Sequence, residues 1–454
     1  MQAANARATR QQEIRQRSAT AARKQAENPN LRGATWWLTR IVLAGMLLIP
    51  FAMSYAYDPF RYPKELLLRV EIIVSVVTLA VAWALGRLDL PRLETRSSWF
   101  RLTAIACGWT ILCALLSTNR LVSIAPAVRV LEYALLFAIM AAILRGLPAW
   151  MAGIVVAPAA VNAAVYILQE LEIWSPFPTN LEIESHLRRT ALIGNPNDVG
   201  SYLVVPALTA AALAFAQRRW RAAWTAAAVF LMAGIVFTHT VAAIGAAAAG
   251  LAVMFALRLR TWRKITAVFA AAAIAGVAVV AAYPPLRERA ALMHDAFAKR
   301  DYEAFTAGRT IPFLAAAAMV RDHPLTGVGP GCFAYHFFDY KIRLQERHRW
   351  MFAHATDYNF GEVHNDHLQV ASETGLPGYA IFLAALVLLA SASWRRRDAP
   401  LPEDERGGLV RMLALPLSTS MFVLALAQFP LELVATTHVY LWGAAAVTAW
   451  RGRP

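Results

Sequence analysis

The sequence HNDHLQVASETGLPGYAIFLAALVLLA, residues 364–390, joins a short polar segment to a long apolar one. From Pro377 onward the chain stays apolar over the length that a helix needs to cross about 30 Å of hydrocarbon. Two histidines, two carboxylates and an amide come just before that apolar run. The stretch therefore predicts a membrane-spanning helix with titratable side chains at one end.

Apolar runs of this kind recur along the whole chain. The 454 residues are 58% hydrophobic and 16% charged, and the mean hydropathy is +0.44. The runs begin near Trp37, Leu66, Trp99, Ile124, Trp150, Val199, Ala222, Val241, Lys264, Pro377, Leu409 and Ala435. Because backbone polar groups in lipid need internal partners, each run must be helical. The predicted fold is all-α, a polytopic integral membrane protein with about 12 transmembrane helices.

The placement of lysine and arginine predicts the topology of these spans. Basic residues in the N-terminal tail and in every second connection fall on one side of the membrane if the chain crosses it about twelve times. The clusters in the connections are Arg87/Arg92/Arg96, Arg145, Arg218/Arg219/Arg221, Arg258/Arg260/Arg263/Lys264, Arg395/Arg396/Arg397 with Arg406, and Arg451/Arg453. Both termini are therefore expected in the cytoplasm. These loops and their attraction to anionic lipid account for most of the net charge of +15, so no nucleic-acid partner is expected.

The spans divide the chain into four segments. Residues 1–36 form a basic cytoplasmic tail with no evident signal peptide, and residues 37–282 hold nine spans and an outer loop at about 170–198. Residues 283–376 form a large outer segment, here called the lid, and residues 377–454 hold the last three spans and a short cytoplasmic C-terminus. Cys107 and Cys113 fall in the third span and Cys332 in the lid, so no disulfide framework is expected.

The composition of the lid predicts an ordered structure. Apolar residues recur with helical spacing over residues 286–299, 309–321, 333–347 and 362–374, which predicts short amphipathic helices, several of them on the bilayer surface. The lid also carries many arginines, and long loops cross the membrane regardless of charge. A basic outer lid indicates an anionic ligand such as a lipid-linked phosphate. The alternative is a solvated charged surface or binding to lipid headgroups.

Two motifs place arginines near helix starts. In HLRRTALIGNPNDVGSYL, residues 186–203, Asn195 is positioned to cap a helix and Pro196 to be its first residue, with Asp198 completing a capping box. Helix N-terminal amides attract anions, and Arg188 and Arg189 lie just upstream. Capping is the favoured role for Asn195 and Asp198, whereas a functional role is favoured for Arg189.

The second motif is AGRTIPFLAAAAMVRDHPLTGVGPGCF, residues 307–333. It places Arg309 near the start of an interfacial helix that ends at Asp322-His323-Pro324. The following turn, residues 327–331, resembles a phosphate-binding loop only superficially. It lacks the preceding strand and the following Lys-Ser/Thr, so it is interpreted as a structural turn.

The polar stretch at 364–374 contains the strongest candidate base. A helix here would place His364, His367, Leu368 and Ala371 on one face, and Gly375 and Pro377 would separate it from the next span. Two histidines three residues apart are a weak metal signal, because a zinc site needs a third ligand. A general base is the preferred role for His364, since imidazole titrates near physiological pH. An interfacial histidine satisfied by hydrogen bonds is the structural alternative.

Together these motifs resemble the O-antigen ligase and O-antigen polymerase superfamily of bacterial envelope glycosyltransferases. The resemblance rests on RRTALIGNPNDVGSYL (188–203), GRTIPF with HPLTGVGPGCF (308–333), HNDHLQVASETGLPG (364–378) and the layout of about twelve spans with a large lid before the last three. DPFRYPKELLL, residues 58–68, is also similar to a stretch found among ligases. One departure is that residues 238–241 read Thr-His-Thr-Val where many members have Thr-x-Ser-Arg.

The resemblance implies glycan transfer at the periplasmic face of the inner membrane. The donor would be a glycan on undecaprenyl diphosphate, and the acceptor of a ligase would be a sugar hydroxyl of the lipid A-core. The family's essential histidine corresponds to His364, and its essential arginines to Arg189 and Arg309. Substrate contacts are further expected from Arg188, Asn195, His367, Arg321, Arg343 and Glu373. The other expected partners are membrane lipids, and the protein is expected to be a monomer without a cofactor.

The same residues predict a simple mechanism and leave alternatives open. The diphosphate is already a good leaving group, so the reaction needs mainly charge neutralisation and one base. No Asp-x-Asp motif lies on the outer face, and metal independence is expected. Within the superfamily, a polymerase or a protein O-oligosaccharyltransferase is the alternative to a ligase. A transporter for lipid-linked glycans, with Arg129 and Glu132 lining a path, is the alternative from another class.

Overall fold

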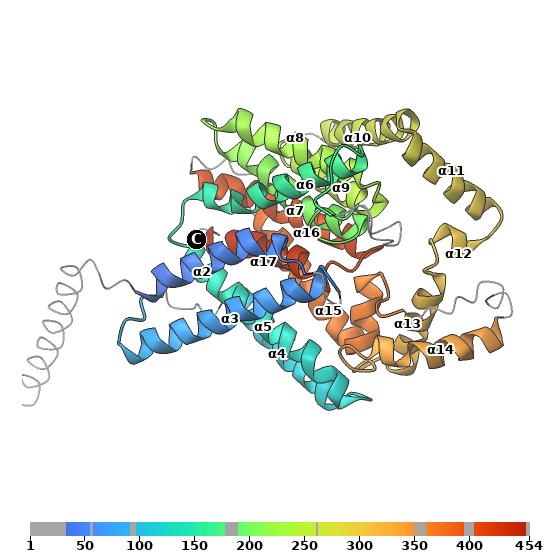
Figure 1. The fold of residues 1–454 in the computed structure, drawn as a ribbon, viewed down its shortest axis with the longest axis horizontal. Helices are drawn as coiled ribbons and strands as arrows, with labels where there is room; N and C mark the ends of the chain where they lie inside the picture. Colours follow the sequence, from blue (N-terminus) through green and yellow to red (C-terminus); the bar gives the residue numbers. More distant parts are fainter. Residues whose placement is uncertain are drawn as a thin grey trace, which may run out of the picture.

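The computed structural model describes residues 33–54, 58–90, 97–177, 189–259, 262–348, 351, 360–394 and 404–450. In these ranges every regular element is a helix, which confirms the all-α prediction (Figure 1). Most of the predicted cytoplasmic tail, Arg188 and the last four residues lie outside the described residues.

A helix occupies each of the expected span positions. They are α2 (Ala34–Leu48) with η1 (Ile49–Phe51), α3 (Arg61–Ala84), α4 (Ser98–Leu115), α5 (Arg120–Leu144), η2 (Ala149–Val155) with α6 (Val156–Glu170), α7 (Pro196–Ala216), α8 (Arg221–Phe237), α9 (Val241–Ala256), α10 (Trp262–Ala282), α15 (Asp366–Trp394), α16 (Glu405–Ala425) and α17 (Val434–Trp450). In the described part of the chain, 8 helical segments are long and apolar enough to cross a membrane, and α8 and α9 are shorter apolar helices. The chain is therefore a polytopic membrane protein, while the number of spans stays a prediction.

The lid contains four further helices: α11 (Pro284–Ala298), α12 (Tyr302–Phe305), α13 (Thr310–Asp322) and α14 (Phe333–Arg347). Figure 1 shows α11 leading away from the bundle and α13 and α14 returning beside the start of α15. Buried residues of α13 and α14, among them Met319, Phe333 and Phe337, form an apolar core separate from that of the bundle. Because the lid buries its own core, it is a folded unit, as its composition predicted.

The start of α15 differs from the prediction. The helix begins at Asp366, and His364 precedes it with a left-handed φ of 59°. Asn365 caps the N-terminus of α15, because its side-chain oxygen accepts a hydrogen bond from the Leu368 amide at 3.0 Å. The prediction that His364 and His367 share a helical face is therefore wrong. The break at Gly375 is confirmed, since its φ of 71° interrupts the helix and a Cβ there would collide with the Leu325 carbonyl.

The bundle is built around α7, which is buried along nearly its whole length. It packs against α8, α9, α16 and α17, and α7, α16 and α17 lie in the middle of the molecule in Figure 1. Small residues allow the close approach; a Cβ on Gly200 would meet Thr238 and Ala243, and one on Gly250 would meet Leu208. Peripheral α4 packs only against α5 and α15 and keeps most of its surface exposed.

Alternate connections meet at opposite ends of the bundle. At one end, here called the lid end, the Lys64 ammonium donates to the Leu192 carbonyl, and the Thr118 amide donates to the Val328 carbonyl in the lid. At the other end, Arg406 donates to the Leu147 carbonyl and Trp450 to the Leu144 carbonyl. The lid thus lies at the same end of the bundle as residues 116–119, which the sequence predicts to be outside. The connections predicted to be inside meet at the opposite end, as alternating spans require.

Candidate active site at the lid end

His364 is a half-buried imidazole held between aromatic rings. Its ring centroid lies 4.6 Å from that of Phe429 and 6.0 Å from that of Phe360, edge to face in both cases. Its Nδ1 atom is buried and has no hydrogen-bond partner among the described residues. Burial, and then the positive charges of Arg309 and Arg61, lower the pKa of His364 to about 4. The imidazole is therefore neutral near pH 7 and able to accept a proton.

Arg309 places a positive charge beside this histidine. It caps the start of α13, and its guanidinium Nη1 donates to the Ala427 carbonyl at 2.8 Å. In the described part of the chain, no carboxylate forms an ion pair with Arg309. Burial and nearby Arg289 lower the pKa of Arg309, yet a guanidinium stays charged in any case. Arg309 is thus a half-buried cation available to an anion.

The connection between α16 and α17, residues 426–433, organises the site through its backbone. Its Leu426 carbonyl accepts from the Asn365 side chain at 2.8 Å, and its Ala427 carbonyl accepts from Arg309. Its Leu431 amide donates to the Asp366 carboxylate at 2.9 Å. Phe429 of the same connection contacts His364 and also lies under the Arg61 guanidinium, 5.0 Å from the ring centroid. This connection therefore sets the relative positions of the candidate base and the two arginines.

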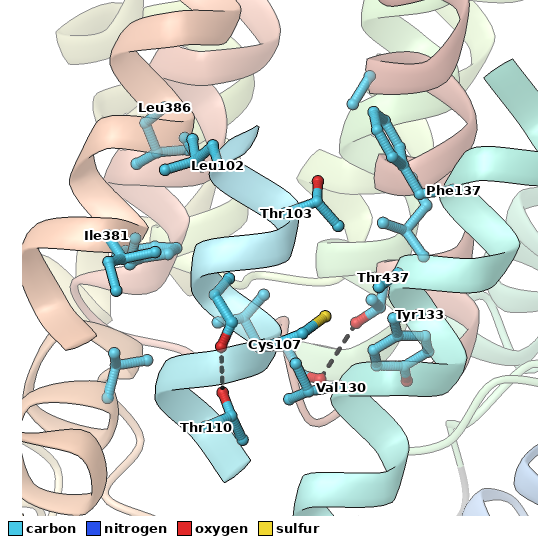
Figure 2. A pocket seen from close by; sticks show the side chains of 18 of the residues that line it. Leu102, Thr103, Cys107, Thr110, Val130, Tyr133, Phe137, Ile381, Leu386 and Thr437 are labelled. Carbon is cyan, nitrogen blue, oxygen red and sulfur yellow. Dashed lines mark hydrogen bonds between the residues drawn. The ribbon is translucent and has the colours of Figure 1, made fainter. Parts of the chain in front are cut away.

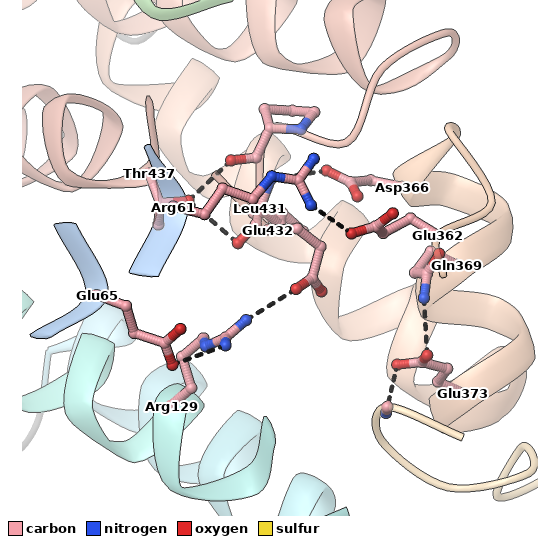
Figure 3. A network of polar contacts seen from close by, with 12 residues as sticks. Arg61, Glu65, Arg129, Glu362, Asp366, Gln369, Glu373, Leu431, Glu432 and Thr437 are labelled. Carbon is pink, nitrogen blue, oxygen red and sulfur yellow. Dashed lines mark hydrogen bonds and ion pairs between the residues drawn. The ribbon is translucent and has the colours of Figure 1, made fainter. Parts of the chain in front are cut away.

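A charged cavity of about 270 Å³ lies at the lid end, and its lining includes Arg61, which shares the Phe429 ring with His364. It is lined by Asp58, Phe60, Arg61, Tyr62, Lys64, Glu65, Arg129, Ile193, Asp198, Glu362 and residues 432–436. Figure 3 shows its ion pairs: Arg61 with Glu362 at 2.7 Å, and Arg129 with both Glu65 at 3.0 Å and Glu432 at 2.9 Å. Burial raises the pKa of Glu432, and the charge of Arg129 opposes that shift. Glu362 lies two residues before His364, so the ion pair with Arg61 ties the lid to α3.

Lys64 has a structural role in the wall of this cavity. Its ammonium donates to the carbonyls of Ala52, Phe60 and Leu192 at 2.8, 2.9 and 2.8 Å. All three of its protons are therefore used, and the side chain is buried. The contact fixes the loop before α7 against the loop before α3.

Arg61, Glu362 and Glu432 were not among the predicted site residues. The position of Arg61 in DPFRYPKELLL, at the start of an apolar span, could have indicated its role, because charged residues there are costly and often functional. Residues 426–433 gave no such signal, since their contacts to Asn365 and Arg309 use backbone carbonyls.

Arg189 lies in a separate polar cluster at the same end. It forms ion pairs with Glu170 at 3.1 Å and Glu172 at 3.7 Å, and His239 lies 3.9 Å from the same Glu170 carboxylate. The His239 imidazole is hydrogen-bonded to the Tyr283 hydroxyl. His239, with a left-handed φ of 55°, thus pairs with a carboxylate and a phenol two residues before Val241, where many members of the resembling family have an arginine. No contact between described residues joins this cluster to His364.

The remaining predicted residues are held by structural contacts. The Asn195 side chain caps α7 by accepting from the Asp198 amide at 3.1 Å, and Pro196 is the first helical residue, as predicted. The Asp198 carboxylate lines the charged cavity. Arg321 and Arg343 are exposed and pair with Asp322 at 3.1 and 3.6 Å.

Two predicted residues of α15 also face away from the cavity. Glu373 accepts from the Gly331 amide at 2.8 Å and from the Phe333 amide at 3.3 Å, so it stabilises the glycine-rich turn. That turn is structural, as predicted. His367 is hydrogen-bonded to the Phe422 carbonyl at 3.0 Å and is surrounded by aromatic rings. Neither Glu373 nor His367 lines the charged cavity.

An apolar cavity of about 390 Å³ adjoins the charged one. Its walls include Thr103 and Cys107 of α4, Val130 and Phe137 of α5, Ile381 and Leu386 of α15, and Thr437 of α17 (Figure 2). Leu431 lines the apolar cavity while the next residue, Glu432, lines the charged cavity. The two cavities thus share a wall, an arrangement that suits a molecule with a charged head and an apolar chain.

One comparison with known proteins bears on the class of the protein. Residues 226–383 match a family model described as O-antigen ligase. The matched region runs from α8 into α15 and includes Arg309 and His364. The match supports membership of the O-antigen ligase superfamily, as the motifs predicted. A search of curated proteins found no match.

Proposed function

We propose that the protein is a membrane glycosyltransferase of the O-antigen ligase type. It transfers a glycan from undecaprenyl diphosphate to a sugar hydroxyl of lipid A-core, at the periplasmic face of the inner membrane. The observation that carries this proposal is the neutral, half-buried His364, whose buried Nδ1 has no partner among the described residues, near the charge of the Arg309 guanidinium. The family match supports a transferase acting on lipid-linked glycans.

In the proposed reaction His364 acts as general base. It takes the proton from the acceptor hydroxyl while the acceptor oxygen bonds to the anomeric carbon and the bond from that carbon to the diphosphate oxygen breaks. The displacement inverts the anomeric centre, and the diphosphate leaves with the electron pair. A positioned base contributes about 10²–10⁴-fold to the rate. The step needs no metal, because the guanidinium supplies the positive charge.

Arg309 is the first candidate for binding the leaving diphosphate. Since no described carboxylate competes for it, a charge-assisted hydrogen bond to phosphate would contribute about 1.5–3 kcal/mol. Arg189 remains a second candidate, but an anion must first replace Glu170 or Glu172 as its partner. The apolar cavity is a suitable place for part of the prenyl chain, because it removes hydrocarbon from contact with polar groups.

The proposal is tested by replacing the base in the purified, reconstituted protein. His364→Ala should lower kcat for glycan transfer by about 100-fold or more, because the acceptor proton then has no positioned acceptor. His294→Ala is the matched control, since His294 is exposed on α11 and should leave the rate unchanged. Normal transfer by His364→Ala would show that His364 is not the base, and no transfer by the wild-type protein would favour the transporter alternative.

The choice within the superfamily needs a cellular readout. Deletion of the protein followed by electrophoresis of the glycolipids should leave lipid A-core without attached glycan if the protein is a ligase. Core carrying a single repeat would indicate a polymerase, and an unmodified acceptor protein would indicate a protein O-oligosaccharyltransferase.

A further inference from the structure

The charged cavity contains polar atoms that lack partners. The Asp198 Oδ1, Arg129 Nε and Thr436 Oγ1 atoms are buried and make no hydrogen bond among the described residues. All three residues line the cavity, and Asp198 is only 4% exposed. Buried polar atoms are nearly always paired, so three unpaired atoms around one cavity indicate a missing ligand. That ligand must offer hydrogen-bond donors and acceptors.

The charge of the cavity argues against a phosphate. Its lining includes five carboxylates, Asp58, Glu65, Asp198, Glu362 and Glu432, and three cations, Arg61, Lys64 and Arg129. All three cations already have partners in the ion pairs and carbonyl contacts described above. An anion placed here would meet a net negative lining, whereas Arg309 outside the cavity has no carboxylate partner among the described residues. A simple cation offers no acceptor to the unpaired Arg129 Nε, so an uncharged polar ligand fits the cavity best.

The size of the cavity limits the ligand further. A volume of about 270 Å³ has room for one sugar ring. A sugar ring carries hydroxyl groups that both donate and accept. Its hydroxyls fit an unpaired carboxylate oxygen, a threonine hydroxyl and a guanidinium N–H around one space.

We propose that the charged cavity binds one uncharged sugar ring of a transferase substrate, with Asp198 Oδ1 accepting from a ring hydroxyl and Arg129 Nε donating to a ring oxygen. The Thr436 hydroxyl completes the set. The diphosphate then lies on the Arg309 side of His364. This inference rests on the proposed function, because it assigns one sugar of that reaction to a place.

The position of the cavity next to the base supports this assignment. Arg61 lines the cavity and lies over the Phe429 ring, and the His364 ring centroid lies 4.6 Å from the centroid of the same Phe429 ring. Glu362, which also lines the cavity, is two residues from His364. The cavity and the imidazole therefore have Arg61 and Glu362 as common neighbours.

Two conservative variants test the sugar site. Asp198→Asn and Thr436→Val keep the shape of each side chain and remove one hydrogen-bonding function, and Asp295→Asn on exposed α11 is the control. Each cavity variant should raise KM for one sugar substrate by about tenfold or more, as expected for the loss of a hydrogen bond to a buried polar group. The control should keep the wild-type KM. A separate Thr436→Val variant keeps the test valid if Asp198→Asn fails to fold.

Inorganic diphosphate distinguishes a sugar site from an anion site. If the cavity holds a sugar, the inhibition constant for inorganic diphosphate is the same in Asp198→Asn and wild type. If it holds an anion, removal of the carboxylate charge tightens inhibition by diphosphate, and the proposal is overturned. An unchanged KM for both sugar substrates in both variants also overturns it.

The source of the sugar is read from the substrate whose KM changes. A change for the lipid A-core acceptor alone assigns its terminal sugar to the cavity, and a change for the donor alone assigns the first sugar of the donor glycan. A wild-type protein that transfers no glycan would refute the proposed function but not this site. Thermal stabilisation by free core oligosaccharide, present in wild type and lost in Thr436→Val, would then still support it, and its absence in wild type would refute it.

Discussion

At the scale of single residues, the pKa of His364 connects the charge of the site to its activity. Burial and the charges of Arg309 and Arg61 hold this pKa at about 4 in the free protein. In the proposed reaction the neutral imidazole is the active form, so we expect activity above the pKa and its loss as the pH falls through the pKa. Diphosphate bound at Arg309, as proposed, would offset one positive charge and raise the pKa of His364 in the substrate complex.

The pH dependence of the kinetics checks this relation. The acid limb of kcat/KM, which reports the free protein, should lie near pH 4, and the limb of kcat should lie at higher pH. Arg309→Gln removes one positive charge and should move the kcat/KM limb upward. Arg321→Gln, at an exposed residue already paired with Asp322, should not move it. Identical limbs in wild type and Arg309→Gln would show that the charge of Arg309 does not act on His364.

The motifs predicted His364 and Arg309 but not their surroundings. A histidine before a span and an arginine before an amphipathic helix leave a local pattern in the sequence. The Arg61–Glu362 pair leaves no local pattern in the sequence, because the two residues are 301 positions apart. His364 was placed on a helix by its spacing, and the capping preference of Asn365 overrode that pattern.

At the scale of elements, α4 is the outer wall of the apolar cavity. Ala106 lines this cavity, whereas Ala104 on the same helix is exposed. Ala106→Trp should fill part of the cavity and raise KM for an undecaprenyl-linked donor by about tenfold or more, because a hydrophobic pocket rejects added volume. KM for a donor with a short prenyl chain should not change. Ala104→Trp is the matched control, and an equal effect of both variants would place the chain elsewhere.

Hydropathy predicted the helices well, because pairing of the backbone polar groups in lipid takes place within each apolar segment. Every run of apolar residues that began near an expected position is a helix, since lipid leaves the backbone no other way to pair its polar groups. Hydropathy does not predict the role of the connection at 426–433. Its residues act by presenting carbonyls and one aromatic ring, and such contacts depend on the tertiary structure.

At the scale of the whole molecule, the alternation of the connections predicts which sites a reagent reaches from outside. Asp295→Cys lies in the lid and Arg218→Cys lies at the opposite end, and both positions are exposed. A membrane-impermeant thiol reagent applied to spheroplasts should label only the former, because the lid end faces the periplasm in the proposed topology. Native Cys113 and Cys332 are buried. Labelling of Arg218→Cys alone would show that the protein has the opposite orientation in the membrane.

The Arg61–Glu362 ion pair limits which fragments of the protein can keep the candidate site intact. The matched segment 226–383 includes Glu362, Arg309 and His364, yet the arginine that holds Glu362 belongs to α3 and the ring beside His364 belongs to the connection before α17. A fragment trimmed to the recognisable region would carry the base without the groups that orient it. Grafting that region onto another scaffold should therefore fail, whereas two complementary pieces synthesised together have the full set of contacts to reassemble.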